Sequence, residues 1–130
     1  MSEEANTHYK HRILCTEDDA DTREILRLQL ELEGFEVTCA EDSAQAISLA
    51  TAEKFDLYLL NHWLPGLAGD VLCQKLRELD STTPILFYSG AASDSDKARA
   101  MASGAQGYIV KPADPDELTS EIRRLIKIKK

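Results

Sequence analysis

The chain has 130 residues, of which 43% are hydrophobic and 29% charged, with a formal net charge of −8 and a pI near 4.8. This length suits one domain with a hydrophobic core, and the composition excludes a chain that is disordered throughout. The acidic balance argues against a nucleic-acid binder, because the phosphates would be repelled. We therefore expect no direct contact with nucleic acid.

No apolar run approaches the roughly 18 residues of a membrane-spanning helix, and the opening MSEEANTHYKH lacks an apolar signal core. We therefore expect a cytoplasmic protein without membrane contact. Residues 1–10 are polar and are expected to form a flexible segment ahead of one domain over residues 11–130.

The three cysteines are Cys15, Cys39 and Cys73, and their spacing does not resemble a metal site. Cys15 and Cys39 lie in apolar runs that have the character of strands. For these two residues the sequence favours small buried thiols over a disulfide.

The first half of the chain alternates apolar runs with amphipathic segments. In chain order this pattern predicts a strand over 12–16, a helix over 19–34, a strand over 35–40, a helix over 43–54, a strand over 55–61 and a helix over 69–79. Ile25, Leu28 and Leu32 recur at helical spacing and are expected to face the core, with Leu26 and Leu30 widening the stripe. Ser43 is expected to cap the second helix. In the third helix, Leu72, Leu76 and Leu79 are expected to face inward.

The second half continues the alternation, with strands predicted over 83–90 and 107–112 and helices over 93–105 and 114–130. Ser93 begins a capping box, and Asp114 is expected to cap the last helix with Pro115 as its first residue. Leu118, Ile122, Leu125 and Ile126 form the inward stripe of that helix. Five strand–helix pairs with short links predict an α/β fold, a parallel sheet covered by helices on both faces.

In an open sheet of this kind, ligands bind beyond the carboxyl ends of the strands. The polar residues predicted at those ends are Glu17, Asp18, Asp19, Asn61, Ser89 and Lys111. Carboxylates held close together repel one another and usually bind a divalent cation, for which Mg²⁺ is the best candidate here. A hydroxyl and an ammonium group opposite the metal would suit a phosphoryl group.

The segments ILCTEDDADTRE, DLYLLNHWLPGLAG, PILFYSG and GAQGYIVKPADPDEL occur in this order along the chain. Together they resemble the receiver domain of bacterial two-component response regulators (CheY-like) over residues 11–128. The resemblance implies a flavodoxin-like (βα)5 fold, a doubly wound parallel sheet with strand order 2-1-3-4-5. It also implies a regulatory role in phosphorelay signalling, and we expect the chain not to be an enzyme.

Three residues correspond to the metal ligands of this family. The resemblance implies that Asp18 binds Mg²⁺ directly and that Glu17 acts mainly through water. The main-chain carbonyl of Trp63 would be the remaining protein ligand. Two expectations concern the loop that carries it: His62 is expected at the surface, and the Trp63 side chain is expected to shield the site from solvent by packing.

Three further residues correspond to the switch residues of the family. Ser89 and Lys111 would contact the phosphoryl group, and Lys111 would precede a cis-proline, Pro112. Tyr108 would report the state of the site through its rotamer. The resemblance places the output on the face made by the fourth helix, the fifth strand and the fifth helix. A histidine kinase, another signalling protein or a neighbouring domain is expected to bind there.

Asn61 departs from the family, because it stands at the position of the phospho-accepting aspartate. An amide oxygen is a poor nucleophile and gives no stable acyl phosphate. The lost negative charge should weaken Mg²⁺ binding by about 1–2 kcal/mol, so weak or absent binding is expected. The carbonyl oxygen of Asn61 could still accept a hydrogen bond from Lys111.

Three interpretations of Asn61 remain open. The chain could be an atypical receiver, or pseudo-receiver, that signals as an interaction module without aspartyl phosphorylation. Alternatively, it could be a conventional phosphorylatable receiver in which a laboratory substitution replaced the aspartate. Finally, Asn61 could deamidate to a working aspartate, although Asn followed by His does not favour rapid deamidation.

Overall fold

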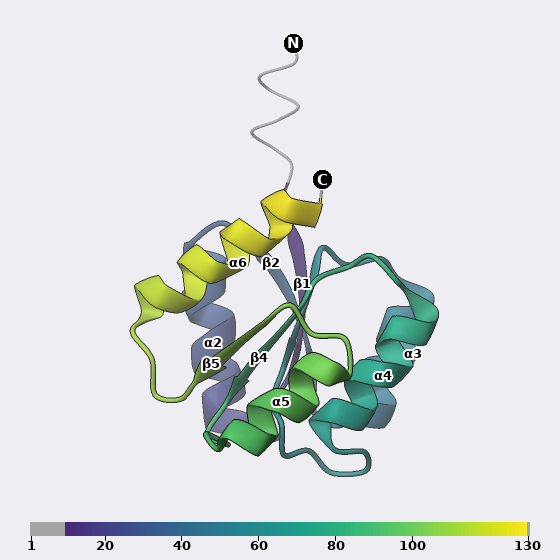
Figure 1. Cartoon of the computed structure of the whole chain (residues 1–130). Coiled ribbons are helices and arrows are strands. Elements are labelled where there is room, and N and C mark those ends of the chain that lie inside the picture. Colours follow the sequence, from purple (N-terminus) through teal and green to yellow (C-terminus); the bar gives the residue numbers. More distant parts are fainter. Residues whose placement is uncertain (1–9, 130) are drawn as a thin grey trace.

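The structure is a computed structural model that describes residues 10–129, so the flexible segment expected at residues 1–10 lies, apart from Lys10, outside the described residues. Five parallel strands form one sheet in the order β2-β1-β3-β4-β5. Helices α2 and α6 lie on one side of the sheet, and α3, α4 and α5 lie on the other (Figure 1). The predicted fold class and strand order are confirmed.

Strands and helices alternate along the chain, as the sequence predicts. The strands are β1 (Arg12–Thr16), β2 (Glu36–Ala40), β3 (Leu57–Leu60), β4 (Ile85–Ser89) and β5 (Gly107–Val110). The helices are α2 (Ala20–Leu32), α3 (Ser43–Ala52), α4 (Gly69–Leu79), α5 (Asp94–Ala102) and α6 (Pro115–Lys129). None of the helices within residues 10–129 is long and apolar enough to cross a membrane.

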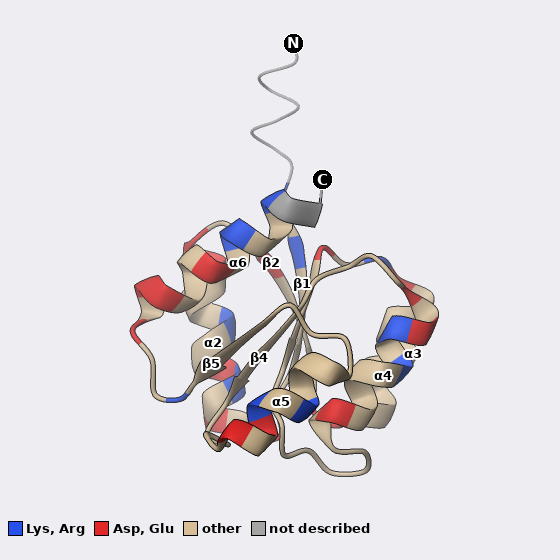
Figure 2. Cartoon of the chain, in the orientation of Figure 1, with Lys and Arg blue, Asp and Glu red and all other residues tan. Residues whose placement is uncertain are grey.

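Two apolar clusters, one on each face of the sheet, form the core. The cluster under α2 and α6 contains the whole predicted stripe of α6, namely Leu118, Ile122, Leu125 and Ile126. The other cluster packs β3 and β4 against α3, α4 and α5. Figure 2 shows acidic residues at the start of α6 and basic residues toward its end, a distribution that complements the helix dipole.

Helix α2 buries a different face from the one predicted. Leu26 and Leu30 are buried, whereas Ile25, Leu28 and Leu32 are 61%, 50% and 88% exposed. Both sets satisfy helical spacing, and only one side of an outer helix can contact the sheet. The apolar period alone therefore could not select the buried face. Leu79 is also exposed rather than inward, because it is the last residue of α4.

The capping predictions were right for α5 and wrong for α3. Ser93 caps α5, since its hydroxyl accepts a hydrogen bond from Asp96 N at 3.0 Å. Asp42, not Ser43, caps α3, because its carboxylate accepts from Gln45 N at 2.8 Å. Ser43 begins the helix instead, and its hydroxyl accepts from Leu67 N at 2.8 Å. Ser43 thereby anchors the loop that follows β3.

Asp80, after α4, makes the fold sensitive to acid. Burial raises the pKa of this carboxyl, but hydrogen bonds from Thr83 and Thr82 outweigh burial and lower the pKa to about 2. A carboxylate with a lowered pKa stabilises the fold at pH values above its ordinary pKa of 3.8, and that stabilisation is lost as the pH falls toward 2. We expect Asp80→Asn to lower the urea midpoint above pH 4 and to approach the unsubstituted protein near pH 2. A deficit that is equal at both pH values would contradict this assignment.

Candidate functional site

The predicted polar residues meet at the carboxyl edge of the sheet. Glu17 follows β1, Asn61 follows β3, Ser89 ends β4 and Lys111 follows β5. Backbone pairing continues one residue past the strands, with Asn61 N donating to Thr16 O at 3.1 Å and Lys111 N donating to Ser89 O at 2.9 Å. The positions of these side chains are therefore fixed by the sheet itself.

The side-chain amide of Asn61 donates toward three oxygens. Its Nδ2 lies 3.4 Å from Glu17 Oε2, 3.3 Å from Asp18 Oδ1 and 3.1 Å from the main-chain oxygen of Trp63. Asn61 is only 8% exposed, and its Oδ1 is buried with no hydrogen-bond partner among residues 10–129. The amide N–H groups thus face the three residues that the resemblance assigned to the metal.

Lys111 pairs with Glu17 instead of with Asn61. Lys111 Nζ lies 2.6 Å from Glu17 Oε1, and the Glu17 side chain is 3% exposed. The expectation that Lys111 donates to the carbonyl oxygen of Asn61 was therefore wrong. A carboxylate accepts more strongly from an ammonium group than a neutral amide oxygen does. The bond between Lys111 and Pro112 is cis, as the resemblance implied.

This set of oxygens does not fit Mg²⁺ in the observed arrangement. Glu17 Oε1 bonds Lys111, and Glu17 Oε2 accepts from Asp19 N at 3.1 Å as well as from Asn61. Mg²⁺ requires oxygens directed at one octahedral position, whereas here an N–H donor already faces Asp18 and the Trp63 carbonyl. No three His, Cys, Asp or Glu side chains in the described part of the chain are grouped to hold a metal ion. A cation would have to displace the Asn61 amide.

Tyr108 points inward toward the loop after β4. Its hydroxyl donates to Ala91 O at 2.6 Å and lies 3.3 Å from His62 Nδ1. Its ring stacks on Phe87, with centroids 5.4 Å apart and an interplanar angle of 3°. Ser89 is fully buried beside this loop, and its hydroxyl accepts from Ala91 N at 3.2 Å. Ser89 and Tyr108 therefore both hold the main chain of Ala91.

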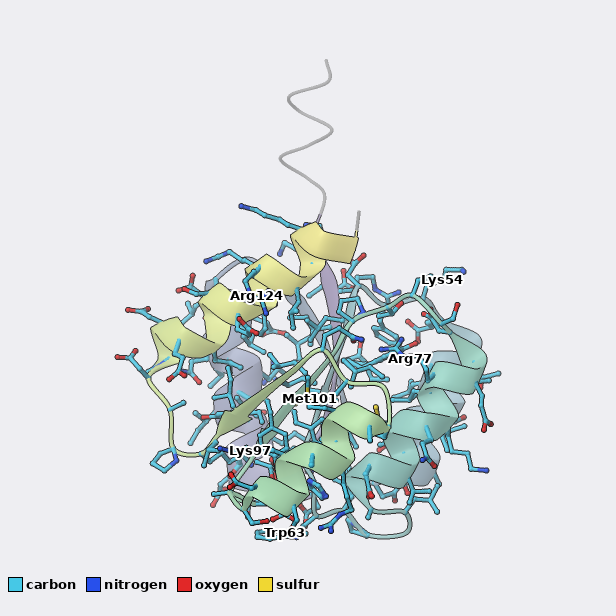
Figure 3. The ribbon with its side chains drawn as sticks, viewed as in Figure 1. Lys54, Trp63, Arg77, Lys97, Met101 and Arg124 are labelled. Carbon is cyan, nitrogen blue, oxygen red and sulfur yellow. The ribbon has the colours of Figure 1, made fainter. Side chains whose placement is uncertain are left out.

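The expectations for His62 and Trp63 were both wrong. His62 is 3% exposed and contacts the rings of Phe87 and Tyr108. The Trp63 side chain is 61% exposed and lies at the lower edge of the molecule in Figure 3. Side chains alternate along an extended chain, and His62 follows Leu60 by two residues on the face that packs against α4. That alternation could have identified His62 as buried.

Comparison of the sequence with known proteins agrees with the resemblance to receiver domains. The family model of the response regulator receiver domain matches residues 13–123. The chain is 34% identical over 118 residues to a Bacillus subtilis protein named uncharacterized transcriptional regulatory protein YkoG, covering 91% of this chain and 52% of that protein. It is 36% identical over 115 residues to the transcriptional regulatory protein CseB of Streptomyces coelicolor, covering 88% of this chain and 49% of CseB. The chain thus spans about half the length of the curated relatives it matches.

Solved structures agree with the sequence comparison. A CheY-like receiver domain protein from Methanospirillum hungatei superimposes with a TM-score of 0.89 and 28% identity, covering 93% of this chain and 97% of that one. The chemotaxis protein CheY4 of Vibrio cholerae gives a TM-score of 0.86 and 27% identity, covering 90% and 99%. Likeness therefore extends over nearly the whole length of both solved chains.

Proposed function

The chain belongs to the response regulator receiver domain family, and we propose that within it this protein is an atypical receiver, a regulatory interaction module that does not use aspartyl phosphorylation. The observation that carries the proposal is the position of Asn61 Nδ2, which faces Glu17, Asp18 and the Trp63 carbonyl at 3.1 to 3.4 Å. An amide at this point offers no carboxylate to attack phosphorus. We infer from the same contacts that Asn61 stands at the phospho-acceptor position.

In this proposal the Asn61 amide replaces the divalent cation as the partner of the acidic residues. Two N–H groups offer partial positive charge to Glu17, Asp18 and the Trp63 carbonyl. Lys111 neutralises Glu17 from the opposite side at 2.6 Å. The two carboxylates can therefore stay close together without bound Mg²⁺, and the domain keeps the geometry of a receiver without its usual chemistry.

The output would lie on the face formed by α5, β5 and α6. A groove of about 440 Å³ opens there, lined by Tyr108, Ile109, Glu117, Ser120, Glu121 and Arg124. Tyr108 also contacts the buried loop at Ala91, so a partner in the groove could sense the position of that loop. Without phosphorylation, the partner itself must bind one conformer better than the other to shift the population.

We propose a histidine kinase, another signalling protein or a neighbouring domain as that partner. The curated relatives are named transcriptional regulators, and the chain spans about half their length. A neighbouring domain in a longer protein is therefore a specific candidate, and we expect this domain itself not to contact nucleic acid. The net charge of −8 supports that division of roles.

Incubation with acetyl phosphate and Mg²⁺ tests the proposal. We expect no phosphoryl adduct on the native protein by intact mass spectrometry, because Asn61 cannot act as the nucleophile. Asn61→Asp should gain one adduct that hydroxylamine removes. Gln74→Glu adds a carboxylate on the exposed face of α4 and should remain unmodified. An acyl phosphate on the native protein would refute the proposal.

A second candidate is a conventional receiver whose natural residue at position 61 is aspartate. The observation that favours it is that Asp18, Ser89 and Lys111 all lie at the same edge of the sheet, as phosphoryl transfer would require. The sequence of the natural gene at codon 61 decides between the two. An aspartate codon, together with a change in partner affinity when Asn61→Asp is phosphorylated, would support the second candidate.

A further inference from the structure

Two cysteines face each other across the first pair of strands. Cys15 on β1 and Cys39 on β2 are direct partners in the register of these parallel strands. Both side chains lie on the same face of the sheet, since Cys15 belongs to the cluster under α2 and α6 and Cys39 packs against that cluster. Both are free thiols in the structure. The sheet therefore holds two thiols side by side.

This placement suits a disulfide. Neighbouring strands lie about 4.7–4.9 Å apart, and disulfides join residues whose Cα atoms are about 4.4–6.8 Å apart. Cys15 and Cys39 are paired Cα positions on adjacent strands, so their separation falls within the range that a disulfide spans. Formation of the bond is therefore compatible with the observed pairing of the two strands.

We propose that Cys15 and Cys39 form a redox-active dithiol, which a hydroperoxide converts into an intramolecular disulfide and a dithiol reductant restores. The Cys39 thiolate attacks the peroxide, the O–O bond breaks, and a sulfenic acid forms at Cys39 with release of hydroxide or alkoxide. Cys15 then attacks the Cys39 sulfur, the S–O bond breaks, and water leaves with the thiol proton. The peroxide is reduced by two electrons, and the two thiols are oxidised by two.

The environments of the two thiols indicate that Cys39 is the one that attacks the peroxide. Cys39 is partly exposed, whereas Cys15 is only 1% exposed. Interaction with Cys15 lowers the pKa of Cys39 and outweighs partial burial, which acts in the opposite direction. The charges of Arg23 and Arg27 add to the lowering, and that of Glu24 opposes it. A thiolate that solvent can reach is the form that peroxides oxidise. Cys15, buried beside it on β1, is placed to resolve the sulfenic acid.

Cys73 supplies an internal control. It is buried in the opposite cluster, and its sulfur lies 3.6 Å from Ser103 O. Burial also raises the pKa of this thiol. Cys73 therefore has neither the partner nor the exposure of the proposed pair. The disulfide does not involve Asn61, so failure to observe it would leave the proposed function unaffected.

Peroxide treatment of the folded protein, followed by alkylation in denaturant and peptide mapping, tests the inference. We expect one crosslinked peptide joining Cys15 to Cys39, an alkylated Cys73, and full recovery of three thiols after dithiothreitol. Cys15→Ala should leave a Cys39 sulfenic acid that dimedone traps, whereas Cys39→Ser should form no disulfide. Cys73→Ser should behave as the native protein does. Sulfinic acid at Cys39 without a crosslink, or a crosslink only after unfolding in urea, would overturn the inference.

Discussion

Asn61→Asp is expected to lower the free energy of unfolding by about 1–3 kcal/mol when divalent cations are absent. The substitution removes the N–H donor shared by Glu17, Asp18 and the Trp63 carbonyl, and it puts a third carboxylate beside two others. Mg²⁺ should restore the lost stability, because the ion would bind the folded variant and not the unfolded chain. Urea unfolding with EDTA and with Mg²⁺ measures both effects.

The matched control for this substitution is Gln74→Glu. Gln74 is exposed on α4, away from the carboxyl edge of the sheet, so the new carboxylate adds the same charge in solvent. We expect little change in stability and no dependence on Mg²⁺. If Asn61→Asp in EDTA is as stable as the native protein, the amide does not hold the acidic residues as proposed.

Lys111→Met is expected to destabilise the fold by about 2–4 kcal/mol, because it leaves the Glu17 carboxylate buried without its counter-charge. Glu17 is 3% exposed in its side chain, and its Oε1 bonds only the ammonium group of Lys111 among the described residues. The double variant Glu17→Gln with Lys111→Met should recover much of the loss, because no unpaired charge remains. A double-mutant cycle from urea unfolding measures this coupling.

An exposed ion pair of equal length provides the control for Lys111. Arg124 and Glu121 on α6 are also 2.6 Å apart, but the Arg124 side chain is 53% exposed, and Figure 3 labels it on α6. Arg124→Met should cost no more than about 1 kcal/mol, because solvent screens exposed pairs. If Lys111→Met and Arg124→Met lower the free energy of unfolding equally, burial of Glu17 is not the source of the effect.

The fold class could be predicted because it depends on local patterns of apolar and polar residues along the chain. Alternation of apolar runs with amphipathic segments predicted a parallel α/β sheet, and the strand order came from the family resemblance. The stripe of α6, from Leu118 to Ile126, was predicted correctly, since all the apolar leucine and isoleucine side chains that the structure describes on that helix lie on one face. Helix α2 has two such stripes, and the choice of Leu26 and Leu30 depends on contacts with the sheet.

The residues that lie at the carboxyl edge of the sheet could be predicted from the sequence, but the hydrogen bonds between them could not. Parallel strands bring Glu17, Asn61, Ser89 and Lys111 together whatever their partners are. The sequence could not show that Lys111 would bond Glu17, because this choice depends on which acceptor the folded backbone presents. The same applies to the Asn61 amide, whose N–H side faces the carboxylates while its oxygen bonds no group in the described part of the chain.

Isothermal titration of the native protein with Mg²⁺ tests most directly whether the Asn61 amide takes the place of a cation. We predict no saturable heat up to the millimolar range, because an ion would have to displace the amide from Asp18 and the Trp63 carbonyl. Asn61→Asp should show saturable binding under the same conditions. Saturable binding to the native protein well below the millimolar range, abolished by Asp18→Asn, would contradict the account.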